Sequence, residues 1–290
     1  MPPSPPRPRV VRISSTAPVI VPVWQHLPLT YRGYRVSHDV REAVLSSFGA
    51  HLDTINIWTH ALGLAYFAAM VPHTLRALSA NGASAADHAL FLLFLACAAS
   101  QMLSSCLYHV FRAVAQLDAF YLTLDIWGIL AMIGGSWVVG MGQGFHCSPS
   151  VAAAYFAGEV ALLAVGAALG KKAMAGRGSW EAYYVAMGAA VAFGAVPCAH
   201  IYWRCATPAC AAGVERAAIG MFGNYVLGYA AFVTRFPEFL MPGLFDIAGH
   251  SHQWWHLFVW NAGRVWLLAN IELNALKGRG ELGPPCGPRA

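Results

Sequence analysis

The sequence is poor in charge. Of its 290 residues, only 11% are Asp, Glu, Lys or Arg, whereas 58% are hydrophobic. Soluble domains carry about 25% charged residues, and a soluble chain of this length has no core large enough for so much apolar surface. The composition therefore excludes an ordinary soluble domain and predicts an all-α integral membrane protein that crosses the bilayer several times.

Other features are missing too. No cluster of alternating basic and aromatic residues occurs, so we expect no nucleic-acid partner. No internal repeat is obvious. The short apolar run Val19–Val23 is interrupted by proline, whereas a signal peptide needs an apolar region of roughly 7–15 residues. We expect residues 1–45 to be a disordered, Pro- and Arg-rich cytosolic tail without a cleaved signal, residues 46–276 to be one membrane domain, and residues 277–290 to be a short C-terminal tail.

Long runs without charge predict a seven-transmembrane helix bundle, because each run is close to the roughly 20 residues that cross a bilayer. We expect the spans near Thr54–Val71, Ala89–Phe111, Ala119–Met141, Val151–Gly170, Ala182–Trp203, Ala217–Thr234 and Ile247–Leu273.

Basic residues indicate the orientation, because they concentrate in the cytosolic segments of membrane proteins. With the N-terminus in the cytosol, eleven basic residues lie inside and six lie outside. The inside set is Arg7, Arg9, Arg12, Arg32, Arg35, Arg41, Arg112, Lys171, Lys172, Arg177 and Arg235; the outside set is Arg76, Arg204, Arg216, Lys277, Arg279 and Arg289. The asymmetry predicts a cytosolic N-terminus and a C-terminus outside.

The same topology places Cys147, Cys205, Cys210 and Cys286 in outer segments and the other three cysteines within spans. A bridge from Cys147 to Cys205 or Cys210 is one expectation in an oxidising compartment. Unpaired thiols are the other.

Ionisable residues inside spans are rare and are candidates for function. His109 ends the second span, Asp125 lies one to two turns into the third, and His252 and His256 begin the seventh. Because successive spans alternate in direction, all four fall at one depth, just below the cytosolic face. The sequence therefore predicts a polar site there.

Spacing predicts that this site holds a metal. Residues four apart on a helix share one face, so His252 and His256 can direct both imidazoles at one ion, and His109 adds a third nitrogen. Three protein ligands and an open position are typical of catalytic zinc, Zn²⁺. Asp125 is then expected to hold the water or to act as the general base, and Ser105, one helical turn before His109, is expected to form a hydrogen bond with the water, a ligand or a substrate oxygen.

Each residue also has a structural interpretation. Histidines near a helix end can reach to the membrane interface, Asp125 can be a structural partner, and serine packs well between membrane helices. His60 and His250 are rival ligands. The stretch FPEFLMPGLFD before the last span is either a cytosolic lid or a positioning turn with Asp246 as the N-terminal cap; we favour the turn.

Several of these motifs occur together in a known family. They are DTINIWTH (Asp53, Asn56, Thr59 and His60), SSCLYH (Ser105 and His109), LDIWGI (Asp125) and RFPEFLMPGLFDIAGHSHQWWH. The combination resembles the progestin and adipoQ receptor family, which includes the adiponectin receptors and is related to the hemolysin III proteins. The resemblance spans roughly residues 31–270. One departure is Asp53, where the family usually has Glu.

The resemblance implies seven helices with the N-terminus inside and a zinc ion bound by His109, His252 and His256, with Asp125 and Ser105 lining the site. Members look like ceramidases, which hydrolyse a sphingolipid amide, or act as receptors for adiponectin-like proteins or steroids. We therefore expect a zinc-dependent amide hydrolase acting on a ceramide-like membrane lipid, a receptor in lipid signalling, or a protein that combines both functions, in the plasma membrane or an endomembrane. A receptor with a structural zinc and an extracellular protein or steroid ligand remains the alternative, because both functions use the same residues.

Overall fold

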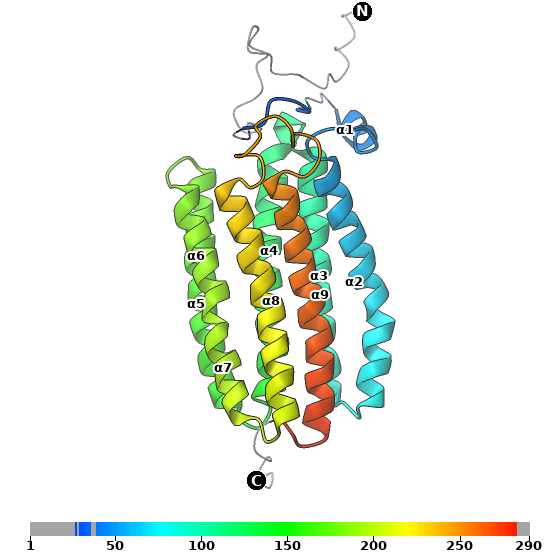
Figure 1. Ribbon diagram of the computed structural model, residues 1–290, viewed down its shortest axis with the longest axis vertical. Coiled ribbons are helices and arrows are strands. Elements are labelled where there is room, and N and C mark those ends of the chain that lie inside the picture. Colours follow the sequence, from blue (N-terminus) through cyan, green and yellow to red (C-terminus); the bar gives the residue numbers. More distant parts are fainter. Residues whose placement is uncertain (1–26, 28, 36–38, 283–290) are drawn as a thin grey trace, which may run out of the picture. The chain divides into compact units, whose positions relative to one another are not determined.

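The computed structural model describes residues 27, 29–35 and 39–282, and all the secondary-structure elements in these residues are α-helices (Figure 1). They are α1 (Val40–Ser46), α2 (Thr54–Ala80), α3 (Ala85–Phe111), α4 (Ala115–Gly144), α5 (Pro149–Met174), α6 (Trp180–Phe193), α7 (Ala195–Arg204), α8 (Pro208–Thr234) and α9 (Ser251–Gly278).

In the part of the chain that the structure describes, six helical stretches are long and apolar enough to cross a membrane, and they match the first six predicted spans. They are α2, α3, α4, α5, the consecutive pair α6 and α7, and α8. The predicted seventh span corresponds to α9, which has 28 residues but is less apolar, because it carries His252, His256, Arg264 and Glu272 among its hydrophobic residues. The seventh crossing and the orientation therefore stay predictions.

Several predicted boundaries differ from the structure, among them the start of α8, which lies at Pro208 and not near Ala217. Helix α2 continues through Pro72 to Ala80, because membrane helices tolerate an internal proline when neighbouring groups satisfy the freed backbone. The predicted fifth span is divided into α6 and α7 at Gly194. Helix α9 begins at Ser251 and not near Ile247, since Gly249 has a positive φ of 90° that a helix does not accommodate.

Part of the predicted N-terminal tail is ordered. The expected boundary at residue 45 falls inside α1, whose first turn is capped by the Asp39 side chain accepting a hydrogen bond from the Glu42 backbone at 2.8 Å. The rest of that tail lies largely outside the described residues, as do residues 283–290 of the C-terminal tail.

The chain divides into two compact units. Unit 1 consists of the described residues up to Gly63 together with Met102–Asp125 and Tyr225–Trp260. Unit 2 consists of Leu64–Gln101, Ile126–Asn224 and the described residues from Asn261 onward. Unit 1 thus holds the ends of helices that carry the predicted site: the start of α2, the end of α3, the start of α4, the end of α8 and the start of α9.

Unit 2 is packed through small residues. A Cβ atom on Gly140 of α4 would lie 2.6 Å from the Trp266 ring of α9, and that ring donates a hydrogen bond to the Ser136 backbone carbonyl at 3.0 Å. Helices α5 and α6 run side by side (Figure 1), where Gly166 faces Met187. Small residues let membrane helices approach closely in this way.

The disulfides differ from the expected pairing. Cys205 is bonded to Cys210, across the connection between α7 and α8. Cys147 is also disulfide-bonded. A bridge from Cys147 to Cys205 or Cys210 is therefore wrong, because those two cysteines lie close enough in sequence to bond to each other. The three cysteines expected within spans, Cys97, Cys106 and Cys198, are free.

Candidate metal centre

Three histidines from two helices meet in unit 1. His109 lies in the last turn of α3, and His252 and His256 lie in the first two turns of α9. Each offers one ring nitrogen, and these nitrogens lie within 4.8 Å of one another. The structure therefore brings together the three histidines that depth and spacing selected.

The spacing of the nitrogens fits one metal ion. The Nε2 atoms of His109 and His252 are 3.3 Å apart. Two nitrogens on a tetrahedral zinc, with bonds of about 2.0–2.1 Å, would lie about 3.3–3.4 Å apart. His109 and His256 are buried and His252 is partly exposed. These three imidazoles, two buried and one partly exposed, could hold a metal ion.

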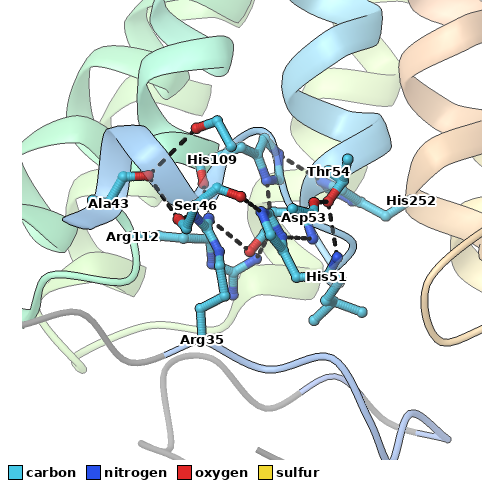
Figure 2. Close-up of polar contacts among 12 residues, drawn as sticks. Arg35, Ala43, Ser46, His51, Asp53, Thr54, His109, Arg112 and His252 are labelled. Carbon is cyan, nitrogen blue, oxygen red and sulfur yellow. Dashed lines mark hydrogen bonds and ion pairs between the residues drawn. The ribbon is translucent and has the colours of Figure 1, made fainter. Parts of the chain in front are cut away.

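Asp53 orients the first of these histidines. The Nδ1 atom of His109 is 2.9 Å from Asp53 Oδ1 (Figure 2). Because a carboxylate can only accept this hydrogen bond, the proton lies on Nδ1 and the lone pair on Nε2 faces His252. Such a carboxylate behind a histidine ligand fixes the tautomer and raises the basicity of the ligand.

Two arginines hold Asp53 in its ionised form. Arg35 Nη2 and Arg112 Nη1 each lie 3.3 Å from its carboxylate. Burial alone would raise the pKa of Asp53, but Arg112, the hydrogen bond from His109 and Arg35 together lower this pKa well below its ordinary value. Arg35 also donates to the backbone carbonyl of His109 at 2.5 Å. The three charged side chains thus connect the segment before α2 with the end of α3.

The turn that carries Asp53 is itself held by hydrogen bonds (Figure 2). The Thr54 hydroxyl accepts from the His51 backbone at 2.9 Å, and His51 Nδ1 accepts from the Asp53 backbone at 3.0 Å. Burial and the neighbouring Arg35 lower the pKa of His51 to about 4, so this imidazole is neutral and can accept. The carboxylate of Asp53 is therefore placed by a rigid helix start.

The start of α9 is positioned by Glu238. Its carboxylate accepts a hydrogen bond from the Ser251 backbone at 2.8 Å and a second, short one from the Ser251 hydroxyl. The expected cap, Asp246, instead accepts from the Tyr31 backbone at 3.2 Å and from Arg32 at 3.4 Å. Asp246 as the N-terminal cap is therefore wrong, because a residue eight positions earlier reaches the first turn from the preceding loop.

Ser105 and Asp125 contact each other. Their side chains share a hydrogen bond, with the Ser105 hydroxyl on α3 donating to the Asp125 carboxylate on α4. Ser105 is buried and Asp125 is partly exposed. Among the described residues, Asp125 is not in the group whose atoms could hold a metal. Both residues lie in unit 1, with the histidines.

The rival histidines have other partners. His250 Nε2 lies 3.1 Å from the Leu52 backbone carbonyl. His60 stacks face to face on His256, with ring centroids 3.8 Å apart and an interplanar angle of 19°. Neither belongs to the histidine group. Thr59, which lies on α2 like His60, also approaches His256, and its Oγ1 atom is 3.5 Å from Nδ1 of His256.

Sequence reasoning missed the roles of Asp53, Arg35 and Arg112. The motif comparison gives Asp53 no role beyond its place in DTINIWTH and its departure from the family's Glu, although a carboxylate directly before a helix that also carries His60 is a usable signal. The two arginines gave no signal, because nothing in their local sequence separates them from ordinary cytosolic basic residues.

The part of the chain that resembles known proteins includes the residues of the candidate metal centre. The family model described as haemolysin-III related matches residues 48–267. Heptahelical transmembrane protein 1 of Arabidopsis thaliana is 29% identical over 243 residues, covering 78% of this chain and 70% of that protein. Progestin and adipoQ receptor family member 3 of Mus musculus is 25% identical over 278 residues, which cover 87% of this chain and 89% of that protein. The adiponectin receptor protein of Drosophila melanogaster is 27% identical over 254 residues, which cover 82% of this chain and 55% of that protein.

These matches confirm the resemblance that the sequence motifs indicated. Together with the six long apolar helices, they show a multi-pass integral membrane protein. The family match includes Asp53, Ser105, Asp125 and all three clustered histidines. With most of its length matched, the chain belongs to the haemolysin-III-related family, within the wider group that includes the progestin and adipoQ receptors.

Proposed function

We propose that this protein binds zinc through His109, His252 and His256 and hydrolyses the amide bond of a ceramide-like membrane lipid. The observation that carries the proposal is the meeting of three imidazole nitrogens within 4.8 Å, with His109 oriented by Asp53. An ionised carboxylate behind a buried imidazole is the support that metal-binding histidines usually have.

The donor set fits zinc better than a hard cation. All three donors are nitrogens, whereas calcium and magnesium prefer oxygen ligands. When bound in such a site, zinc polarises a carbonyl oxygen and makes water a stronger acid. Three protein donors leave a position for a substrate or water.

Asp125 is the residue that we propose takes up the proton during hydrolysis. Its carboxylate is partly exposed and accepts a hydrogen bond from Ser105. The Ser105 hydroxyl would hold that carboxylate in place, because a serine has one donor to give and Asp125 receives it. A partly exposed carboxylate close to an amide bond can act as a general base.

The proposed topology has seven crossings, with α9 as the seventh, a cytosolic N-terminus and an outer C-terminus. The charge asymmetry supports it. The Cys205–Cys210 disulfide supports it too, because disulfides persist in oxidising compartments and both cysteines lie in a segment expected outside. The metal centre would then lie near the cytosolic face.

A receptor without turnover is the second candidate function. It is favoured by the names of two relatives, an adiponectin receptor protein and a progestin and adipoQ receptor family member. In that case the histidine group would hold a structural zinc, and an extracellular protein or a steroid would be the ligand.

One assay separates the two functions. The purified protein is incubated with ceramides of different acyl length, and released fatty acid and long-chain base are measured by mass spectrometry. A His252→Ala/His256→Ala variant is the control for contaminating hydrolases. Release by the wild type and not by the variant supports hydrolysis. No release from any ceramide by a zinc-loaded wild type rejects hydrolysis in favour of the receptor.

A further inference from the structure

Two polar side chains in the first turns of α2 are buried without a partner. Asn56 is 0% exposed and His60 is 2% exposed. Within the described part of the chain, neither amide atom of Asn56 has a hydrogen bond, and neither ring nitrogen of His60 has one of ordinary geometry. The contact of the His60 ring nearest to a hydrogen bond is with the backbone of His256. The two residues are four apart, so they lie on one face of the helix.

Their neighbours on the same segment are fully engaged. Asp53 contacts His109 and two arginines, and the Thr59 hydroxyl donates to the Ile55 carbonyl at 2.8 Å. The start of α2 therefore satisfies its polar groups in general. Buried polar side chains nearly always have a partner, and an orphaned one points to a ligand or water at the site.

The orphaned groups lie beside the candidate metal centre. The His60 ring stacks on the ring of His256 at 3.8 Å. Stacked rings direct their nitrogens outward from the stack edge and not at each other, which explains why His60 is outside the metal-holding group. The pair thus borders the metal centre without belonging to it.

We propose that Asn56 and His60 form a binding subsite for the hydroxyl groups of a neutral lipid head. The amide of Asn56 and a neutral imidazole each offer both a donor and an acceptor, and a hydroxyl group complements both. Neither side chain brings a fixed charge that would bind a phosphate. The subsite therefore selects hydroxyl-bearing neutral lipids, and its identification with a ceramide head rests on the proposed function.

The test uses two probes that differ by one hydroxyl: a short-chain ceramide and its 1-deoxy analogue. Thermal stabilisation of the purified, zinc-loaded protein measures binding, and fatty-acid release measures turnover. The variants are Asn56→Leu, which removes the amide nitrogen and oxygen at similar size, and His60→Phe, which keeps the stacked ring and removes its nitrogens. Thr74→Val is the matched control, because it also removes a buried, unpartnered polar group of α2, outside unit 1.

We expect the wild type and Thr74→Val to prefer the ceramide by about tenfold or more, since a site built for a hydroxyl rejects an analogue that lacks it. Asn56→Leu and His60→Phe should reduce that preference to about threefold or less with zinc content unchanged. If Asn56→Leu does not fold, His60→Phe decides alone.

The subsite is overturned if the wild type does not distinguish the probes in binding, if both variants keep the preference, or if His60→Phe loses zinc. A different result would reject the proposed hydrolysis without rejecting the subsite. If the wild type binds the ceramide preferentially but releases no fatty acid, the subsite stands and the protein is a lipid-binding receptor.

Discussion

His109 Nδ1 and Asp53 Oδ1 lie 2.9 Å apart, although 56 positions separate the two residues in the chain. This contact places a proton on one side of the imidazole and a free lone pair on the other. It also joins the start of α2 to the end of α3. The orientation of His109 within the histidine group and the packing of unit 1 therefore depend on the same carboxylate.

Asp53→Asn should weaken zinc binding about 10–100-fold, because the carboxylate behind a histidine ligand orients it and raises its basicity. It should also destabilise the protein by about 3–5 kcal/mol, since Arg35 and Arg112 lose a buried partner. Competition with a chelator and thermal melting measure the two effects. Asp53→Glu is the control and should keep most of the zinc affinity. Unchanged affinity in Asp53→Asn would contradict the orienting role.

The double substitution His252→Ala/His256→Ala should abolish zinc binding, because it removes two of three nitrogens that converge. His250→Ala should retain zinc, since His250 contacts the Leu52 carbonyl and lies outside the group. Metal analysis of the three purified proteins gives the answer. Equal zinc in the wild type and the double variant would reject the ligand assignment, and loss of zinc in His250→Ala would add a ligand to it.

Asp125→Asn should retain zinc and the fold while lowering amide hydrolysis about 10²–10⁴-fold, because an amide cannot take up the proton. Ser105→Ala should be milder, since it removes one hydrogen bond worth about 0.5–1.5 kcal/mol. Zinc content and fatty-acid release are measured for each variant under one condition. Should Asp125→Asn lose zinc in step with activity, Asp125 is a ligand or a structural anchor.

Removing the Glu238 carboxylate should destabilise the start of α9. Glu238→Ala leaves the Ser251 backbone amide and hydroxyl without their acceptor, and loss of a helix cap costs about 0.5–2 kcal/mol. Asp246→Ala is the comparison, because it releases Tyr31 and Arg32 but leaves Ser251 engaged. Thermal melting and zinc content should both fall further in Glu238→Ala. The reverse order would restore Asp246 as the residue that positions α9.

Epitope tags at the two termini test the topology. In cells with the protein at the surface, we expect a C-terminal tag to be accessible to antibody before permeabilisation and an N-terminal tag only after it. Cys205 and Cys210 should resist a membrane-impermeant thiol reagent until the disulfide is reduced from outside. A C-terminal tag that needs permeabilisation contradicts the outer C-terminus, and tags that both need it contradict an odd number of spans.

The helical membrane class and the three histidines followed from the sequence alone. Low charge and long apolar runs are local properties, and so is the spacing of His252 and His256, which the period of an α-helix places on one face. The expected depth of His109, which stays a prediction, follows from the alternating direction of successive spans. These inferences needed no knowledge of how the helices rotate about their axes.

Only the tertiary structure decided which groups meet the histidines. Asp53, Arg35 and Arg112 reach one another across sequence separations of 18 and 59 residues, and no local period encodes such a contact. The same is true of Glu238 in place of Asp246 at the start of α9, and of the stacking of His60 on His256. Neighbouring residues in the sequence set the periodicity of a helix. The rotation and packing of whole helices depend instead on all their contacts at once. This packing determined which partners each polar side chain meets.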